Sequence, residues 1–182
     1  MALEATFRQL SVSLHKLHDA LNALHVTTGD RPDDETALAD SLESAVLELM
    51  GTLHETRRSA LQARKAVGYQ PDLDRARRAL TRCQERFHRI EQQFSAELVS
   101  YEKLKELARL GNERRAWLPW ANTVKQGIEQ CRGPLDETSK ALAACWQELA
   151  ERLGTVSLSV QTIGQQIKMP ASTKALEPEG VT

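Results

Sequence analysis

The sequence predicts an all-α protein, built as an elongated, antiparallel four-helix bundle with coiled-coil-like packing. Aromatic residues make up 4% of the 182 residues and charged residues 27%, a composition typical of helical bundles. Apolar residues recur in steps of three and four along four long stretches, which is the spacing of one helix face. Glycine and proline occur between these stretches, where helices end.

The first stretch, residues 3–26, has the strongest periodic pattern in the chain. It ends in a polar run that contains Gly29 and Pro32. Seven apolar residues at heptad spacing form its seam, the line of side chains expected to face the core: Leu3, Phe7, Leu10, Leu14, Leu17, Leu21 and Leu24.

The second stretch, residues 34–67, has three acidic residues at its start, Asp33, Asp34 and Glu35, and these suit a helix N-terminus. Its seam changes in size along the helix, from Leu38, Leu42, Val46, Leu49 and Leu53 to Thr56, Ala60 and Ala63. Small residues let a neighbouring helix approach closely, which is the interpretation we favour over an open space. The short turn at residues 68–71 predicts that the next helix is an antiparallel neighbour.

The third stretch begins near Asp72 and stops at Gly111 and Asn112. Its seam is Ala76, Leu80, Cys83, Phe87, Ile90, Phe94, Leu98, Tyr101, Leu104 and Ala108. The fourth stretch, residues 119–167, keeps its apolar phase across Gly133 and Pro134, so we expect one long helix that is kinked at Pro134. Residues 155–160 also alternate apolar with polar, and a short strand added to a partner's sheet is the alternative for residues 155–168.

We expect a single domain over residues 1–168 and a flexible tail over residues 169–182, which are rich in Pro, Glu and Thr. Cys83, Cys131 and Cys145 all fall on seams, as buried reduced thiols would, and this favours the cytoplasm. No apolar run approaches the ~18 residues of a membrane span, so no integral membrane segment is expected.

Catalytic and metal sites have little support. The chain carries no phosphate-binding glycine loop, nucleophile elbow or paired-cysteine motif, and we expect neither an enzyme nor a cofactor. A di-metal bundle needs two Glu-x-x-His motifs, whereas Glu85 and His88 form one. His15, His18 and His25 share a helix face with Asn22, and Asp19 is predicted to lie off that face. We interpret these polar residues as flanks of the leucine seam and predict no metal site.

Charge is distributed unevenly, although the net charge is only −1. Residues 27–55 hold eight acidic residues against Arg31 alone, a net of −7, and residues 56–90 hold ten basic against three acidic, a net of +7. Five arginines of the third stretch fall within an arc of about 80° at ~100° per residue, well away from the seam. These candidate binding residues, which we expect to face solvent, are Arg75, Arg78, Arg82, Arg86 and Arg89.

The turn before the fourth stretch places Trp117 and Trp120 beside Arg114 and Arg115. Tryptophan is common in binding anchors, so both are candidate binding residues. The alternative, which we favour, is that they cap the core over Leu107 and Leu110.

The function that these patterns favour is that of a non-catalytic helical adaptor or assembly subunit. It would bind protein partners, a second copy of itself among them, through a charged bundle end and long helical faces. The alternative is a nucleic-acid-associated small subunit of a ribonucleoprotein complex that uses the arginines of the third stretch.

Overall fold

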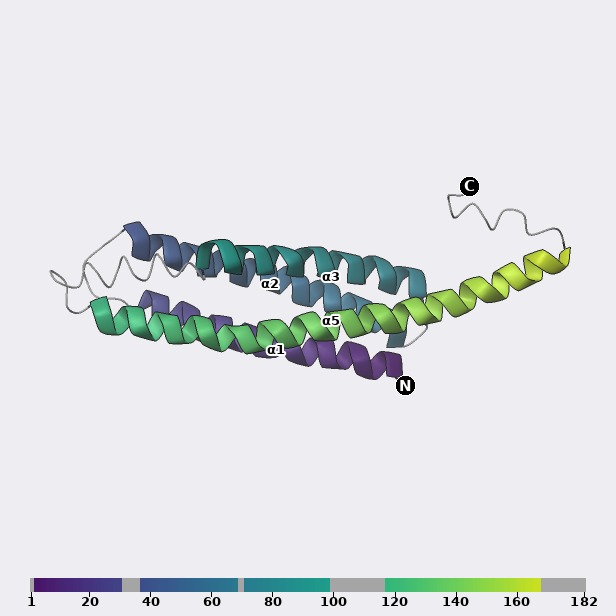
Figure 1. Ribbon diagram of the computed structural model, residues 1–182, viewed down its shortest axis with the longest axis horizontal. Coiled ribbons are helices and arrows are strands. Elements are labelled where there is room, and N and C mark those ends of the chain that lie inside the picture. Colours follow the sequence, from purple (N-terminus) through teal and green to yellow (C-terminus); the bar gives the residue numbers. More distant parts are fainter. Residues whose placement is uncertain (1, 31–36, 69–70, 99–116, 168–182) are drawn as a thin grey trace.

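The computed structural model describes residues 2–30, 37–68, 71–98 and 117–167, and these residues form helices without a strand. The helices are α1 (Ala2–Gly29), α2 (Ala37–Gly68), α3 (Leu73–Gln93), the π-helical turn η1 (Phe94–Leu98) and α5 (Trp117–Ile167). Successive long helices run in opposite directions (Figure 1). The predicted elongated antiparallel bundle is therefore confirmed.

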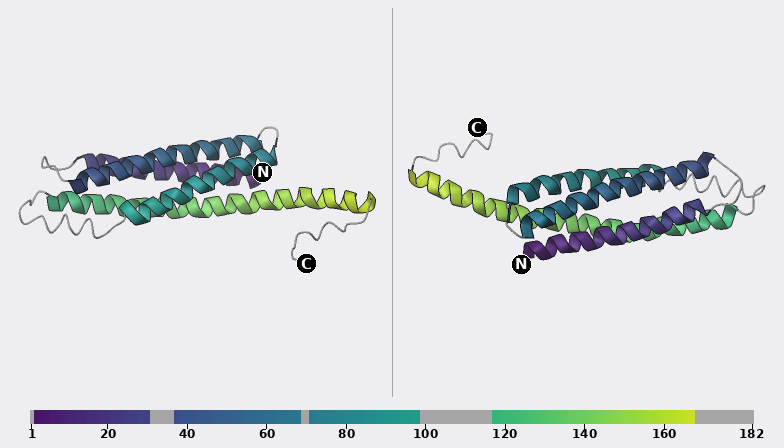
Figure 2. Two further views of the ribbon diagram at one scale, coloured as in Figure 1. Left: turned by 90° about the horizontal axis from the view of Figure 1, so that it is seen from above. Right: turned by 180° about the vertical axis from the view of Figure 1, so that it is seen from behind.

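The four long helices form two layers, with α2 and α3 over α1 and α5 (Figures 1 and 2). α1 packs extensively on α5 and on α2, and α2 packs on α3, whereas the packing between α3 and α5 is sparse. α1 and α2 consequently lie at the centre of the packing. Each is held on two sides, and together they form one long face of the bundle.

The leucine seam of α1 is the centre of the core, as its heptad spacing predicts. Phe7 and the leucines from Leu10 to Leu24 are at most 1% exposed. Burial of this many large side chains is the main source of stability in such a bundle. Gly127 lets α5 approach this seam closely, because a Cβ atom at that position would lie 2.9 Å from Leu24 Cδ1.

α2 buries two different kinds of side chain. Its first half buries Leu42, Val46, Leu49 and Leu53, and its second half buries Thr56, Ser59, Ala60, Ala63, Ala66 and Val67. The predicted change from large to small seam residues is therefore present in the structure. The side chain of Leu38 lies outside the described residues.

The turn between α2 and α3 is closed by Asp72. Its backbone N–H donates to the carbonyl of Ala66 at 2.8 Å, and its carboxylate accepts from the N–H of Arg75 at 3.1 Å. Asp72 is thus the N-cap of α3, since it pairs an otherwise unsatisfied first-turn donor. This cap fixes where the arginines of α3 begin.

α3 keeps its predicted seam as far as Phe94, which is 3% exposed. There the α-helix gives way to η1, a π-helical turn that the apolar pattern did not predict. The predicted seam residues beyond this turn, Tyr101, Leu104 and Ala108, lie outside the described residues.

α5 is one helix of 51 residues, and it continues through Pro134. Proline lacks an N–H, so one helical hydrogen bond is missing there, and the neighbouring Thr138 hydroxyl donates to the Pro134 carbonyl at 2.7 Å. The prediction of a single helix across Pro134 is confirmed, whereas the kink itself stays a prediction. The helix also includes residues 155–167, so the strand alternative is wrong for them. The predicted tail, residues 169–182, lies outside the described residues.

Candidate protein-binding surface

The angular positions of the five arginines of α3 predicted that all of them face solvent, and this is wrong for one of them. Arg75, Arg78, Arg82 and Arg89 are exposed, but the side chain of Arg86 is only 33% exposed. Arg86 Nη1 donates to the Ser59 hydroxyl, and Nη2 lies 3.9 Å from the Glu55 carboxylate. Arg86 therefore belongs to the packing between α3 and α2.

The reason for this correction is Ala79, which the predicted seam omitted. Ala79 is fully buried, so the face of α3 that packs on α2 is wider than the line through Leu80 and Phe87. Arg86 comes one heptad after Ala79 and lies on the edge of that wider face. Arg82 also turns toward α2, where its Nη2 donates to Gln62 Oε1 at 3.3 Å. Of the five, the exposed arginines without such a contact to the described part of α2 are Arg75, Arg78 and Arg89.

Trp120 is buried at 6% exposure, and its Nε1 donates to the Thr27 carbonyl at 2.9 Å. It therefore joins the start of α5 to the end of α1, a contact that was not predicted. Its burial agrees with the cap interpretation, and it is not an exposed anchor. Its predicted cap partners, Leu107 and Leu110, and the side chain of Trp117 lie outside the described residues.

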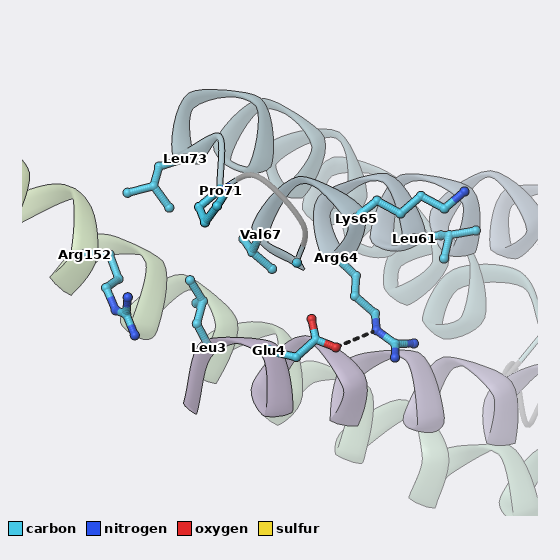
Figure 3. A pocket seen from close by; sticks show the side chains of 10 residues that line it. Leu3, Glu4, Leu61, Arg64, Lys65, Val67, Pro71, Leu73 and Arg152 are labelled. Carbon is cyan, nitrogen blue, oxygen red and sulfur yellow. Dashed lines mark hydrogen bonds and ion pairs between the residues drawn. The ribbon is translucent and has the colours of Figure 1, made fainter. Parts of the chain in front are cut away.

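A recess lies where α1, the end of α2, the start of α3 and α5 meet. It is a cavity of about 670 Å³ (Figure 3). Its apolar floor consists of Leu3, Leu61, Val67, Pro71 and Leu73, and its basic rim consists of Arg64, Lys65 and Arg152.

One carboxylate enters this rim. Glu4 Oε1 lies 3.4 Å from Arg64 Nε (Figure 3). It also lies 3.3 Å from Arg8 Nη2. Arg64 is thereby held across the recess, whereas Lys65 and Arg152 form no ion pair within the described part of the chain. The recess therefore has an apolar floor and retains positive charge at its edge.

A second recess of about 470 Å³ lies beside the first along the same two helices. Leu61 and Arg64 line both recesses, and the second adds Ser11 and Leu14 from α1 and His54, Arg57 and Arg58 from α2. We call the two together the basic groove. It extends along the second half of α2, where the buried side chains are small.

Some residues of this groove could be predicted from the sequence. Arg57, Arg58, Arg64 and Lys65 were counted in the basic segment, but their helix was not distinguished from the next one. Leu61 lies outside the predicted seam of its helix, and this was the available signal in the sequence. In the structure Leu61 is 46% exposed. Leu3, Glu4 and Arg152 were missed as groove residues because nothing local indicates that the start of α1 and the middle of α5 lie beside the end of α2.

Two histidines of α1 are brought together with Asp19, which was predicted to lie off their face. Asp19 Oδ2 lies 3.6 Å from His15 Nε2, and Oδ1 lies 3.7 Å from His18 Nδ1. Three possible metal donors thus lie within 4.8 Å of one another. Arg57 Nη2 is 3.5 Å from His15 Nδ1, which puts a cation beside the group and makes an ordinary polar cluster the better interpretation.

The three cysteines are free and buried. Burial raises the pKa of the Cys83, Cys131 and Cys145 thiols to about 12. Thiolate is the reactive form of cysteine, so these thiols are unreactive near neutral pH. Their burial agrees with the packing role that the sequence predicted.

No protein-family model, curated protein or solved structure matches this chain. Within the described residues, no helix combines the length and the apolarity that crossing a lipid bilayer requires.

Proposed function

We propose that this protein is a non-catalytic adaptor or assembly subunit of the cytoplasm, and that it binds a helical segment of a protein partner in the basic groove. The partner segment carries apolar side chains along one face and acidic side chains beside them. The observation that supports this proposal best is the combination, in one recess of about 670 Å³, of an apolar floor and a basic rim.

The chemistry of the groove matches such a segment on both counts. Leucine-sized side chains remove the exposed surface of Leu61 from water. Glutamate and aspartate beside them reach Lys65, Arg58 and Arg152. An amphipathic helix places apolar anchors at i, i+3, i+4 and i+7 on one side, which is how helices occupy grooves between other helices. The length of the groove along α1 and α2 suits this shape.

A synthetic helical peptide tests the proposal. The probe has leucines at i, i+3, i+4 and i+7 with glutamates on both flanks, and its control has lysines in place of the glutamates. We expect titration calorimetry to detect binding of the acidic peptide and not of the basic one. The variant Lys65→Glu, Arg152→Glu should weaken binding by at least ~10-fold, because two attractive contacts become repulsive.

The matched control is the variant Arg75→Glu, Arg78→Glu, which makes the same change of charge on α3, away from the groove. It should bind the acidic peptide as wild type does. Equal binding of the acidic and basic peptides, or equal losses in both double variants, would contradict the proposal.

The nucleic-acid alternative depends on the exposed Arg75, Arg78 and Arg89. Phosphate contacts release counterions, so binding would weaken steeply as salt rises. A duplex or single-stranded oligonucleotide that binds with a steep salt slope, and loses this binding in the Arg75→Glu, Arg78→Glu variant, would favour that function. Arg82 and Arg86 are unsuitable for the test, since their replacement also disturbs contacts with α2.

A further inference from the structure

α2 presents two large apolar side chains to solvent. Leu47 is 50% exposed and Leu61 is 46% exposed, and they lie fourteen residues apart, so two heptads bring them to the same side of the helix. His54 and Gly51, both exposed, lie between them. A Cβ atom at Gly51 would meet nothing within 4 Å, so another helix can approach closely there. This outer face of α2 has the form of a helix-packing surface.

The charges of α2 divide at the same place. Its four acidic residues, Asp40, Glu43, Glu48 and Glu55, all precede its four basic residues, Arg57, Arg58, Arg64 and Lys65. A parallel pair of such helices would bring like charges together, whereas an antiparallel pair places each acidic half on a basic half. The charge pattern of α2 is therefore complementary to itself in the antiparallel direction only.

The leucines obey the same symmetry. Leu47 and Leu61 are equally distant from His54, which lies near the middle of Ala37–Gly68. A two-fold axis at His54 sets Leu47 of each copy beside Leu61 of the other, on the floor of the basic groove. A two-fold dimer interface requires such a self-complementary surface.

We propose that two copies of this chain associate antiparallel through α2, with the acidic half of each α2 in the basic groove of the other. This inference rests on the proposed function, because it names the acidic helical segment as α2 of a second copy. The α1–α2 pair forms the near face of the bundle when it is seen from behind, and α5 with its projecting end lies behind this pair (Figure 2). That end of α5 therefore leaves the face open to a second bundle.

Charge reversal tests this pairing. One variant reverses exposed acidic residues (Asp40→Lys, Glu48→Lys), and the other reverses exposed basic residues (Arg58→Glu, Lys65→Glu). Wild type should sediment at twice the 20.4 kDa of one chain, and each variant alone should weaken self-association by at least ~10-fold. An equal mixture of the two variants should restore the double mass, since one of the two contacts then joins the unaltered basic half of the first variant to the unaltered acidic half of the second. Native mass spectrometry should then find one copy of each variant.

The mixture also separates pairing from folding, because a variant that merely unfolds is not rescued by a second one. Arg75→Glu, Arg78→Glu serves as the matched control and should keep the wild-type mass. A single-chain mass for wild type, a double mass for either α2 variant alone, or no recovery in the mixture would overturn the inference. If wild type has a single-chain mass and the acidic peptide still binds the groove, only this inference fails. If neither association occurs, the proposed function fails as well.

Discussion

The two halves of α2 differ in size, charge and surface, although they belong to one continuous helix. The first half is acidic and buries leucine and valine, so its inner face fills the space between its neighbours. The second half is basic and buries alanine, serine and threonine, and beside it lies the basic groove. The difference shows how one helix can serve both as core and as a binding surface. Large seam residues supply stability, and small ones leave recesses at the surface beside them.

The largest effect should come from the core side of this comparison. Leu49→Ala removes a side chain that is 1% exposed, and we expect a loss of about 2–5 kcal/mol in the free energy of unfolding. Leu61→Ala removes an equal side chain that is half exposed, and should cost less than about 0.5 kcal/mol. Urea melts of the two variants measure the difference. Equal losses would mean that Leu61 also belongs to the core.

Replacing a buried small side chain of the second half of α2 by a larger one should destabilise the fold. Ala63 is fully buried within the small seam, so Ala63→Leu should cost about 1–3 kcal/mol through overpacking. Ala144→Leu on the exposed side of α5 makes the same change and is the matched control, and its melt should stay close to wild type. If Ala63→Leu left stability unchanged or raised it, the small residues would be leaving empty space inside the bundle.

Arg86 and Arg89 differ in their contact with α2, and their replacement should show it. Arg86→Ala removes the hydrogen bond to buried Ser59 and should cost about 1 kcal/mol. Arg89→Ala removes an exposed side chain and should stay within about 0.5 kcal/mol of wild type. A comparison of denaturation midpoints tests this pair. A larger loss of stability for Arg89→Ala than for Arg86→Ala would mean that Arg86 faces solvent and does not contribute to the packing of α3 on α2.

The cysteines make a prediction about alkaline pH. Burial raises the pKa of each thiol in the folded chain from 9.0 to about 12, so the unfolded chain loses these protons first as pH rises. Their contribution to stability is therefore complete below about pH 9 and is lost between about pH 9 and pH 12. A thiol reagent at pH 8 should react slowly with native protein and rapidly in urea. Rapid reaction of all three native thiols would show that they are accessible.

Much of the fold could be predicted from the sequence, because each seam is a local pattern. Leu10 and Leu17 of α1, or Leu49 of α2, are marked for the core by their spacing alone. The sequence pattern also predicted that the fourth helix continues through Pro134, since the apolar phase does not change there. η1 was not predicted, because a π-helical turn leaves the local apolar spacing up to Phe94 unchanged.

The candidate surface was predicted only in part, because it depends on which helices meet. The basic segment was evident, but the arginines of α3 were chosen over those of α2. Arg86 was assigned to solvent because Ala79 was not counted in the seam. Glu4 and Arg152 carry no local signal at all. They become part of the groove only when three helix ends come together in space.

The central claim is that the basic groove beside the second half of α2 binds an acidic, apolar-faced helix. Methyl NMR of leucine-labelled protein, titrated with the acidic peptide, tests it most directly. We predict that the methyl signals of Leu3 and Leu61 shift and saturate, while those of Leu17 and Leu49 in the core stay in place. Unchanged Leu3 and Leu61 signals, or saturable shifts confined to other regions of the bundle, would contradict the claim.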